Sequence, residues 1–170
     1  LYPFYLFLQE AGLSTLFRRA DEYGLPLIIG GAEVTLWEMA SLYRSLARGG
    51  RFTPLQVLTE NPVDRQETRS ISPGACYLTL EMLRQVHRPG AEYYWQQYQD
   101  RWPLAWKTGT SYGQRDAWAV GVNPQWTIAV WVGNFDGEGN AQLGGARSAG
   151  PLLFDIFNAL PRDAENRWFT

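Results

Sequence analysis

Apolar residues in the first 50 positions recur every three or four residues, the spacing that places them on one face of an α-helix. The strongest helix start is at Thr35, because Glu38 follows at the spacing of a capping box and an apolar face comes next. The glycines of Gly49–Gly50 end that helix. A shorter helix is predicted after an N-cap at Ser14, with Gly24 as its stop.

The middle of the chain alternates polar and helical patterns. A polar, charged stretch with a proline predicts an exposed loop over residues 61–70. Ser72 followed by Pro73 is typical of a helix start, because proline at the first helical position gives up no hydrogen bond that the helix needs. We expect this helix to run to about Val86, and the aromatic, glutamine-rich residues 93–98 predict one more short helix.

After position 103 the pattern changes to extended segments rich in β-branched and aromatic residues. It predicts strands over Leu104–Thr110, Asp116–Val122 and Trp126–Gly133. The turn Asn123–Gln125 is too short for a crossover connection, so the last two strands form an antiparallel hairpin.

A loop with six glycines follows over Gly133–Gly150, and it lacks the spacing of a phosphate-binding loop. Helical spacing then returns over Pro151–Leu160. The predicted order is helices, a three-stranded antiparallel sheet and a C-terminal helix, which is an α+β fold class rather than a βαβ arrangement.

The length, charge and residue composition of the chain exclude some classes of function. The 170 residues suit one compact domain, and a net charge of −2 would not attract a polyanion, so we expect no nucleic-acid partner. One cysteine, Cys76, and one histidine, His87, are too few for a structural zinc site, and we expect no metal or other cofactor.

Apolar runs are short throughout the chain. The longest, Leu1–Leu8, is far below the roughly 20 residues of a membrane helix. The chain opens with leucine and has no signal-peptide pattern. We therefore expect an internal piece of a longer protein.

The candidate chemistry lies in Lys107-Thr108-Gly109-Thr110, which contains the only lysine of the chain; every other basic residue is arginine. Side chains alternate along a strand, so Lys107 and Gly109 share one face while Thr108 and Thr110 share the other. The missing side chain of Gly109 lets a ligand or a packed helix approach the backbone closely. An ammonium and two hydroxyls can hold a carboxylate, and a strand N–H can stabilise an oxyanion, as one side of an acyl-transfer site requires. A four-residue segment of this kind also occurs by chance in many proteins. The neighbouring sequence must therefore decide whether it is catalytic.

The context supplies several further motifs in order. K-T-G stands beside S-x-x-K and S-x-N in the motif set of penicillin-binding proteins and serine β-lactamases. The segments Trp106–Gly113, Arg115–Gly121 and Ala129–Gly133 together closely resemble the transpeptidase domain of class A penicillin-binding proteins, and Leu27–Thr35 resembles that family's glycine-punctuated approach to a helix. The resemblance covers nearly the whole chain.

This resemblance implies a partial transpeptidase fold of the penicillin-binding protein and serine β-lactamase type, and a role in cross-linking peptidoglycan through a serine acyl-enzyme. The implied activity of the whole protein is that of a serine-type D-Ala-D-Ala transpeptidase or carboxypeptidase. The resemblance also implies that Lys107 and Thr110 are catalytic and that Lys107, Thr108, Gly109 and Thr110 bind substrate. The implied partners are the D-Ala-D-Ala end of a stem peptide, β-lactams and the upstream part of the same protein. The implied location is the periplasmic face of the bacterial inner membrane, with a membrane anchor and a glycosyltransferase domain outside this chain.

Two family motifs are missing from the sequence. An S-x-x-K ending at Lys107 would need serine at position 104, which is Leu104, and no serine is followed two places on by asparagine. We expect both motifs upstream of Leu1, residues 1–161 to be the C-terminal portion of the transpeptidase domain, and residues 162–170 to be a tail or the start of a linker. The piece alone is then inactive.

A competing interpretation comes from the tryptophans, of which five of eight fall between Trp102 and Trp131. Aromatic faces stack on sugars, so a non-catalytic glycan- or partner-binding module with an aromatic surface is the alternative function. Packing in the core or beside a cleft is the simpler explanation for most of these rings.

Overall fold

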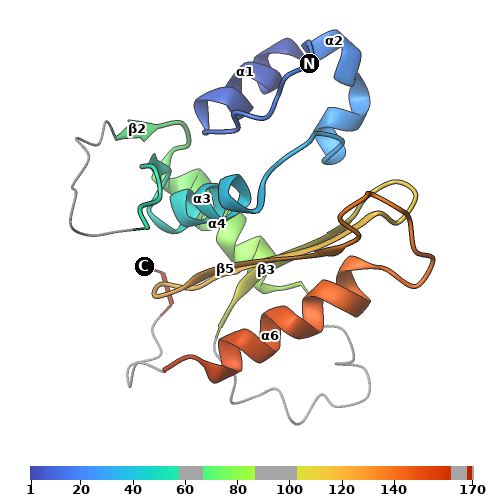
Figure 1. The fold of residues 1–170 in the computed structure, drawn as a ribbon. Coiled ribbons are helices and arrows are strands. Elements are labelled where there is room, and N and C mark those ends of the chain that lie inside the picture. The colour runs from blue at the N-terminus through green and yellow to red at the C-terminus, as the bar shows by residue number, and fades with distance from the viewer. Residues whose placement is uncertain (58–66, 87–102, 162–167, 170) are drawn as a thin grey trace. The chain divides into compact units, whose positions relative to one another are not determined.

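The chain forms two compact units, Leu1–Tyr77 and Leu78–Thr170, each with its own core. Figure 1 labels their main helices and strands. The structure, a computed structural model, describes residues 1–57, 67–86, 103–161 and 168–169. The helix predicted over 93–98 and most of the tail at 162–170 lie outside the described residues.

The first unit is mainly helical. Its elements are α1 (Tyr2–Glu10), α2 (Ala20–Tyr23), the 3-10 helix η1 (Leu25–Ile29), α3 (Leu36–Ala47), the antiparallel pair β1 (Arg51–Phe52) and β2 (Thr68–Arg69), and the start of α4 (Pro73–Arg84). Its core is made by Leu13, Leu16, Tyr23 and Leu27, against which residues of α1 and α3 pack.

The helix start at Thr35 is confirmed. The Thr35 hydroxyl accepts a hydrogen bond from the Glu38 N–H at 3.1 Å, and the Glu38 carboxylate accepts one from the Thr35 N–H at 2.8 Å, which completes the capping box. The start at Pro73 is confirmed as well, since the Ser72 hydroxyl accepts from the Ala75 N–H at 3.3 Å. That helix ends at Arg84, two residues before the predicted Val86.

The prediction for Ser14 is wrong. The helix that it was expected to cap spans only Ala20–Tyr23, although it does end at Gly24 as expected. Ser14 instead donates two hydrogen bonds to Glu38 Oε1, from its N–H at 2.6 Å and its hydroxyl at 2.8 Å. The Ser14 hydroxyl, which would have capped a local helix, is therefore hydrogen-bonded to a carboxylate that is distant in the sequence.

The loop predicted over 61–70 is partly wrong. Thr68–Arg69 forms β2 and pairs with β1, so a short two-stranded sheet occupies the end of this segment. Position 67 and the serine at 70 flank the strand, and the remainder of the segment lies outside the described residues.

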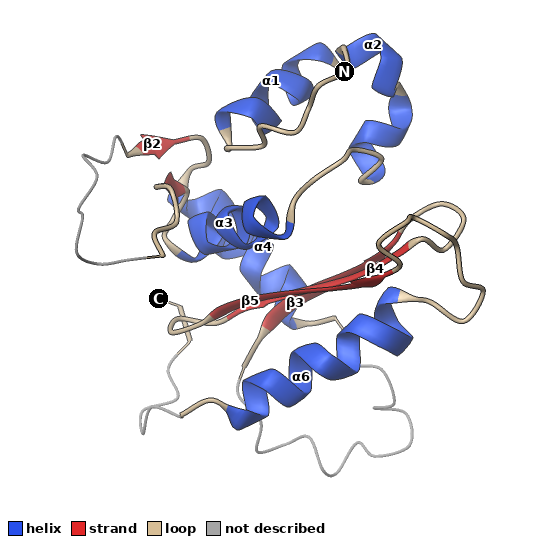
Figure 2. Cartoon of the chain, in the orientation of Figure 1, coloured by secondary structure: helices blue, strands red, loops and turns tan. Residues whose placement is uncertain are grey.

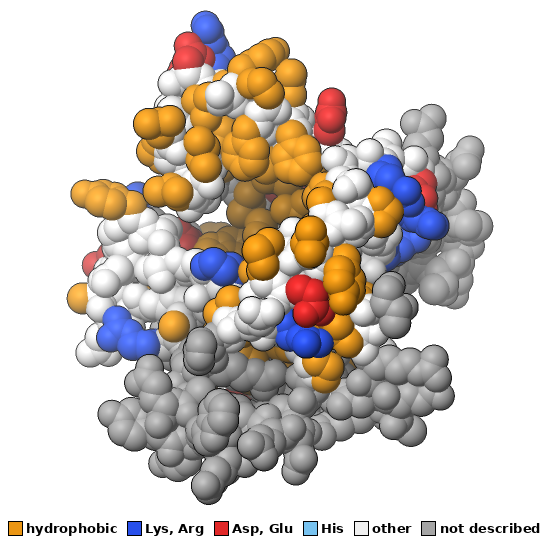
Figure 3. Space-filling view, turned by 180° about the vertical axis from the view of Figure 1, so that it is seen from behind, with side chains coloured by type: hydrophobic (Ala, Val, Ile, Leu, Met, Phe, Trp, Pro, Cys, Tyr) orange, Lys and Arg blue, Asp and Glu red, His pale blue; other side chains and the backbone are white. Residues whose placement is uncertain are grey.

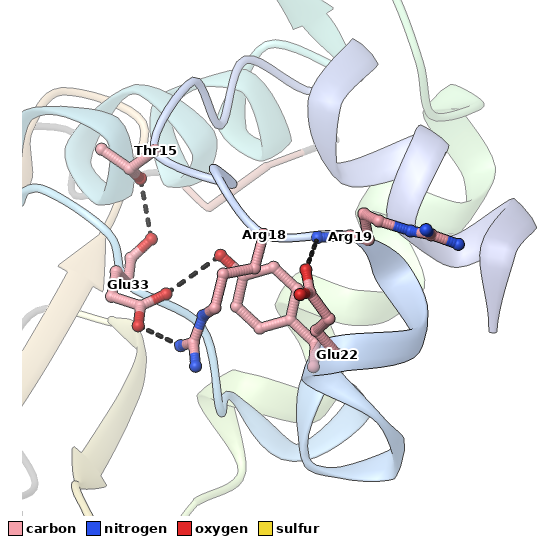
Figure 4. Close-up of polar contacts among 6 residues, drawn as sticks. Thr15, Arg18, Arg19, Glu22 and Glu33 are labelled. Carbon is pink, nitrogen blue, oxygen red and sulfur yellow. Dashed lines mark hydrogen bonds and ion pairs between the residues drawn. The ribbon is translucent and has the colours of Figure 1, made fainter.

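Polar contacts hold the segment that precedes α3 (Figure 4). The Glu33 carboxylate accepts a hydrogen bond from the Tyr23 hydroxyl at 3.0 Å and forms an ion pair with Arg18. Its backbone carbonyl accepts from the Thr15 hydroxyl at 2.7 Å. The Arg18 guanidinium also lies 4.6 Å from the centroid of the Tyr23 ring, a cation–π distance. Glu33 thus fastens the segment before α3 to residues 15–23.

The second unit contains an antiparallel sheet in the order β3 (Ala105–Thr110), β4 (Asp116–Val122), β5 (Thr127–Gly133). A π-helix, η3 (Gly145–Ala149), contacts all three strands and leads into α6 (Gly150–Ala159). Figure 2 shows α6 lying along one face of the sheet. The predicted strands, the hairpin and the C-terminal helix are confirmed, and so is the α+β fold class. The π-helix inside the glycine-rich loop was not predicted.

The core of this unit lies between the sheet and α6. It is formed by side chains of one sheet face and the inner face of the helix: Leu104, Trp106, Ala117, Ala119, Val130, Ala149, Leu153 and Phe157. Trp106 is locked in place, because its ring meets Phe154 edge-on at 4.9 Å and its indole N–H donates to the Val86 carbonyl at 3.1 Å.

Near the end of the chain, Trp168 packs onto the second half of α4. Its indole N–H donates to the Glu81 carboxylate, and the Arg84 guanidinium lies 5.0 Å from its ring centroid. Part of the predicted tail is therefore held within the second unit.

A pair of neighbouring leucines tests the packing of α6. Leu153 is fully buried against the sheet and Leu152 is exposed. We expect Leu153→Ala to lower the free energy of unfolding by about 2–5 kcal/mol, through lost burial and the cavity left behind. Leu152→Ala should change it by less than about 0.5 kcal/mol. Urea unfolding of both variants checks this, and equal losses would contradict the described packing.

Candidate active site

The Lys107–Thr110 segment lies on the outer edge of the sheet, because β3 pairs with β4 alone among the described strands. The Ser111 N–H donates to the Asp116 carbonyl at 3.0 Å, so these two residues form a hydrogen-bonded pair. Such pairs alternate along an antiparallel ladder. Gly109 and Lys107 therefore direct their backbone groups toward β4, while Thr108 and Thr110 direct theirs to the open edge.

The Lys107 side chain lies on the sheet face opposite α6. It is exposed, and its ammonium bends round the strand to donate to the Thr108 carbonyl at 2.6 Å. Gly109 shares this face and lies opposite Trp118 of β4, whose Cβ would be 3.7 Å from a Cβ built on the glycine. The ammonium is thus at the strand edge with no side chain of residue 109 beside it.

The side chains of Thr108 and Thr110 lie on the other face, with Trp106. The Thr110 hydroxyl accepts a hydrogen bond from the Gly145 N–H at 2.9 Å. A hydroxyl can also donate one hydrogen bond, so that proton remains available to a ligand. The two threonines and the lysine therefore approach the edge from opposite faces, and they meet only at the edge itself.

The strand acquires this orientation from its neighbours. Trp106 is buried by α6 on one side, and alternation then turns Lys107 outward on the other. Asp116, at the start of β4, accepts a hydrogen bond from the Trp131 indole N–H at 2.8 Å. The Asp116 carboxylate is therefore engaged with an aromatic ring of β5.

No group of three or more histidine, cysteine, aspartate or glutamate side chains is arranged to hold a metal ion in the described ranges. Likewise, among the helices that the structure describes, none has the length and apolar character to cross a membrane.

The family is settled by a match over most of the chain. Residues 22–158 match the family model of the penicillin-binding protein transpeptidase domain. This chain belongs to that family. The match includes the strand edge described above and the whole three-stranded sheet.

Relatives among known penicillin-binding proteins agree. The chain is 36% identical over 153 residues to penicillin-binding protein 1C of Escherichia coli, covering 90% of this chain and 19% of that protein. It is 31% identical over 144 residues to penicillin-binding protein 1B of Haemophilus influenzae, covering 78% of this chain and 18% of that protein. The chain therefore spans about a fifth of the length of these relatives.

Solved structures show the same fold. The crystal structure of penicillin-binding protein 1A from Haemophilus influenzae superposes with a TM-score of 0.67 at 21% identity, over 97% of this chain and 31% of that one. Penicillin-binding protein A from Mycobacterium tuberculosis, solved as an imipenem acyl-enzyme complex, gives 0.60 at 22% identity, over 91% and 42%. The transpeptidase fold expected from the sequence is confirmed.

One contact of the site was missed by reasoning from sequence. Gly145, in the glycine-rich loop, binds the Thr110 hydroxyl from 35 residues away. The one signal in the sequence is the density of glycines in that loop.

Proposed function

We propose that this chain forms one wall of the acylation site of a peptidoglycan D,D-transpeptidase. The observation that carries the proposal is the strand edge, where the Thr110 N–H points away from β4 and the Lys107 ammonium reaches the same edge. A donor N–H beside a fixed positive charge is the arrangement that stabilises an anionic tetrahedral intermediate.

Each residue of the segment has a distinct proposed role. Lys107 supplies positive charge beside the nucleophile and the substrate carboxylate. Thr108 and Thr110 bind that carboxylate through their hydroxyls, and Gly109 leaves the approach open. The Thr110 N–H is one of two oxyanion donors, and the other belongs to the nucleophilic serine, which this sequence does not contain. Removal of one such donor costs about 10²- to 10³-fold in rate.

The proposed substrate is a stem peptide that ends in D-Ala-D-Ala. The serine oxygen attacks the carbonyl between the two D-alanines, the peptide bond breaks, and the terminal D-alanine leaves with a proton on its amine. An amine of a second stem peptide then displaces the serine and forms the cross-link. An extended peptide can also pair with the open edge of β3, as in other β-strand additions.

β-Lactams are proposed as substrate mimics at the same edge. Support comes from the similar structure of penicillin-binding protein A, which was solved as an imipenem acyl-enzyme complex.

We further propose that residues 1–161 are the C-terminal portion of the domain and 162–170 a tail. The whole protein is proposed to carry a glycosyltransferase domain and a membrane anchor, and to act at the periplasmic face of the bacterial inner membrane.

An exposed apolar surface supports the idea that this chain completes a larger domain. The first unit exposes Leu25, Ile28 and Ile29 on η1, and Figure 3 shows apolar side chains gathered on the surface of this unit. Contiguous apolar patches on soluble proteins usually mark surfaces that contact something else.

A labelling experiment tests the need for the rest of the protein. Residues 1–170 alone should form no covalent adduct with a fluorescent penicillin, because neither S-x-x-K nor S-x-N is present. The full-length protein, treated identically, should form an adduct that survives heating in detergent. Specific, heat-resistant labelling of residues 1–170 would contradict the proposal.

A glycan- or partner-binding surface is the second candidate. It is favoured by exposed rings on the second unit: Tyr112, Trp126, Trp131 and Phe135. It is weakened by Trp106, which is buried and serves the core. Retention of the chain on purified glycan strands, lost in a Tyr112→Ala/Phe135→Ala double variant, would favour this candidate.

A further inference from the structure

The first residue of η3 lies directly against the Lys107–Thr110 segment. The Gly145 N–H donates to the Thr110 hydroxyl at 2.9 Å. A Cβ built on Gly145 would lie 2.4 Å from the Gly109 carbonyl oxygen, 3.0 Å from the Gly109 nitrogen and 2.9 Å from the Trp118 carbonyl oxygen. Gly145 therefore covers the hydrogen-bonded pair that joins β3 to β4 at position 109.

We infer that Gly145 is a positioning residue for the acylation site, holding the Gly109-Thr110 edge in place from behind. The inference rests on the proposed function. Gly145 touches no substrate in this proposal. It acts through the Thr110 hydroxyl, whose lone pair it occupies, and through the backbone of Gly109.

This contact has two consequences for the site. By occupying an acceptor position of the Thr110 hydroxyl, the Gly145 N–H leaves that group to act as a donor toward a substrate carboxylate. By packing on the Gly109 peptide, it fixes the strand that carries the Thr110 N–H. A displacement of about 1 Å at a catalytic group can cost about 10²-fold in rate, so this support matters for the chemistry.

The requirement for glycine comes from the close approach and not from the backbone conformation. Gly145 is not among the residues with positive φ, so alanine can adopt its backbone angles. The atoms that a Cβ would meet belong to the backbone of β3 and β4. A flexible side chain could move away from the new methyl group, but a paired peptide group cannot.

The segment also has little freedom to retreat from the strand. Gly144 accepts hydrogen bonds at its carbonyl from the N–H groups of Arg147 and Ser148, at 3.0 and 2.7 Å, and both Gly144 and Gly145 are buried. A Cβ on residue 145 must therefore displace β3, η3 or both. π-Helical turns like η3 are also frequent at functional sites.

Gly144 provides a matched control one residue away. Its φ of −163° is ordinary extended backbone. A Cβ there would meet only the Arg147 side chain, at 3.5 Å from Nε and 3.7 Å from Nη2, which is normal contact. Gly144→Ala thus adds the same methyl group to the same loop without touching the strand.

The test compares the two variants in the full-length protein, with penicillin as the probe. For Gly145→Ala, the first-order acylation constant should fall about 10- to 100-fold, while the dissociation constant of the non-covalent complex changes less than about twofold. Gly144→Ala should change both constants less than about twofold. Equal acylation by both folded variants would overturn the inference, and so would a loss confined to non-covalent binding. A wild-type protein that penicillin does not acylate would instead overturn the proposed function.

If Gly145→Ala does not fold, substitutions of Thr110 test the same contact. Hydrogen exchange at the Gly145 amide should stay slow in Thr110→Ser, which keeps the acceptor oxygen, and should accelerate at least about tenfold in Thr110→Val, which lacks it. Unchanged exchange in Thr110→Val would overturn the inference, whatever its acylation rate.

Discussion

Replacing Lys107 with alanine in the full-length protein is expected to slow acylation by penicillin about 10²- to 10³-fold. The ammonium lies at the open edge of β3, and it is the only lysine of the chain. Without it, neither the substrate carboxylate nor the charge developing at the nucleophile has this positive partner. Stopped-flow or fluorescent-penicillin labelling gives the acylation constant directly.

Two further variants test whether the effect depends on the shape of the cationic group and on its position. Lys107→Arg keeps the charge but replaces a compact ammonium by a planar guanidinium, so we expect only partial recovery. Arg115→Ala removes an exposed cation from the neighbouring hairpin turn, and it should leave acylation within about twofold of wild type. Unchanged acylation in Lys107→Ala, or an equal loss in Arg115→Ala, would remove Lys107 from the site.

Replacing Glu38 with glutamine is expected to lower the free energy of unfolding of the chain by about 3 kcal/mol. Glu38 is buried, and its carboxylate accepts hydrogen bonds from the N–H groups of Ser14, Thr15 and Thr35 and from the hydroxyls of Ser14 and Thr35. An amide in its place would turn an NH₂ group toward these donors. Urea unfolding at pH 7 measures the loss.

The same carboxylate predicts how stability depends on pH. Burial raises the pKa of Glu38, but the hydrogen bonds from Thr35, Ser14 and Thr15 outweigh it and lower the pKa to about 2. A folded pKa below the unfolded one adds stability at neutral pH. That contribution should fade as the pH falls from about 4.5 to about 2, and Glu38→Gln should abolish this part of the pH dependence.

Glu22 is the matched control for this prediction. It makes the same contact back to the N-cap backbone, since its carboxylate accepts from the Arg19 N–H at 2.7 Å, but it is exposed. Glu22→Gln should cost no more than about 1 kcal/mol. Similar losses in both variants would show that Glu38 acts only as a helix cap.

Local signals in the sequence predicted most regular elements. The capping box at Thr35, the Ser72-Pro73 start and the three strands each depend on neighbours within a few positions, and all are present. The failures involve distant partners. Ser14 binds a carboxylate 24 residues away, and β2 forms because β1 is available to pair with it. Local propensity contains no information about such pairings.

In the candidate site too, the sequence predicted the local features and not those that depend on distant partners. Alternation along a strand correctly separated the faces of Lys107 and Thr110. It could not show that β3 is an edge strand, or that the Thr110 N–H points outward, because both depend on which strand pairs with it and in what register. The contact from Gly145 was equally invisible, since a glycine-rich loop carries no pattern that reveals what its backbone touches.

A crystal structure of the full-length protein acylated by penicillin tests the central proposal most directly. We expect the acyl carbonyl oxygen about 3 Å from the Thr110 nitrogen, and the drug's carboxylate in contact with Lys107 and the threonine hydroxyls. An adduct on a serine remote from β3, or a Thr110 N–H already bonded to another strand of the protein, would contradict it.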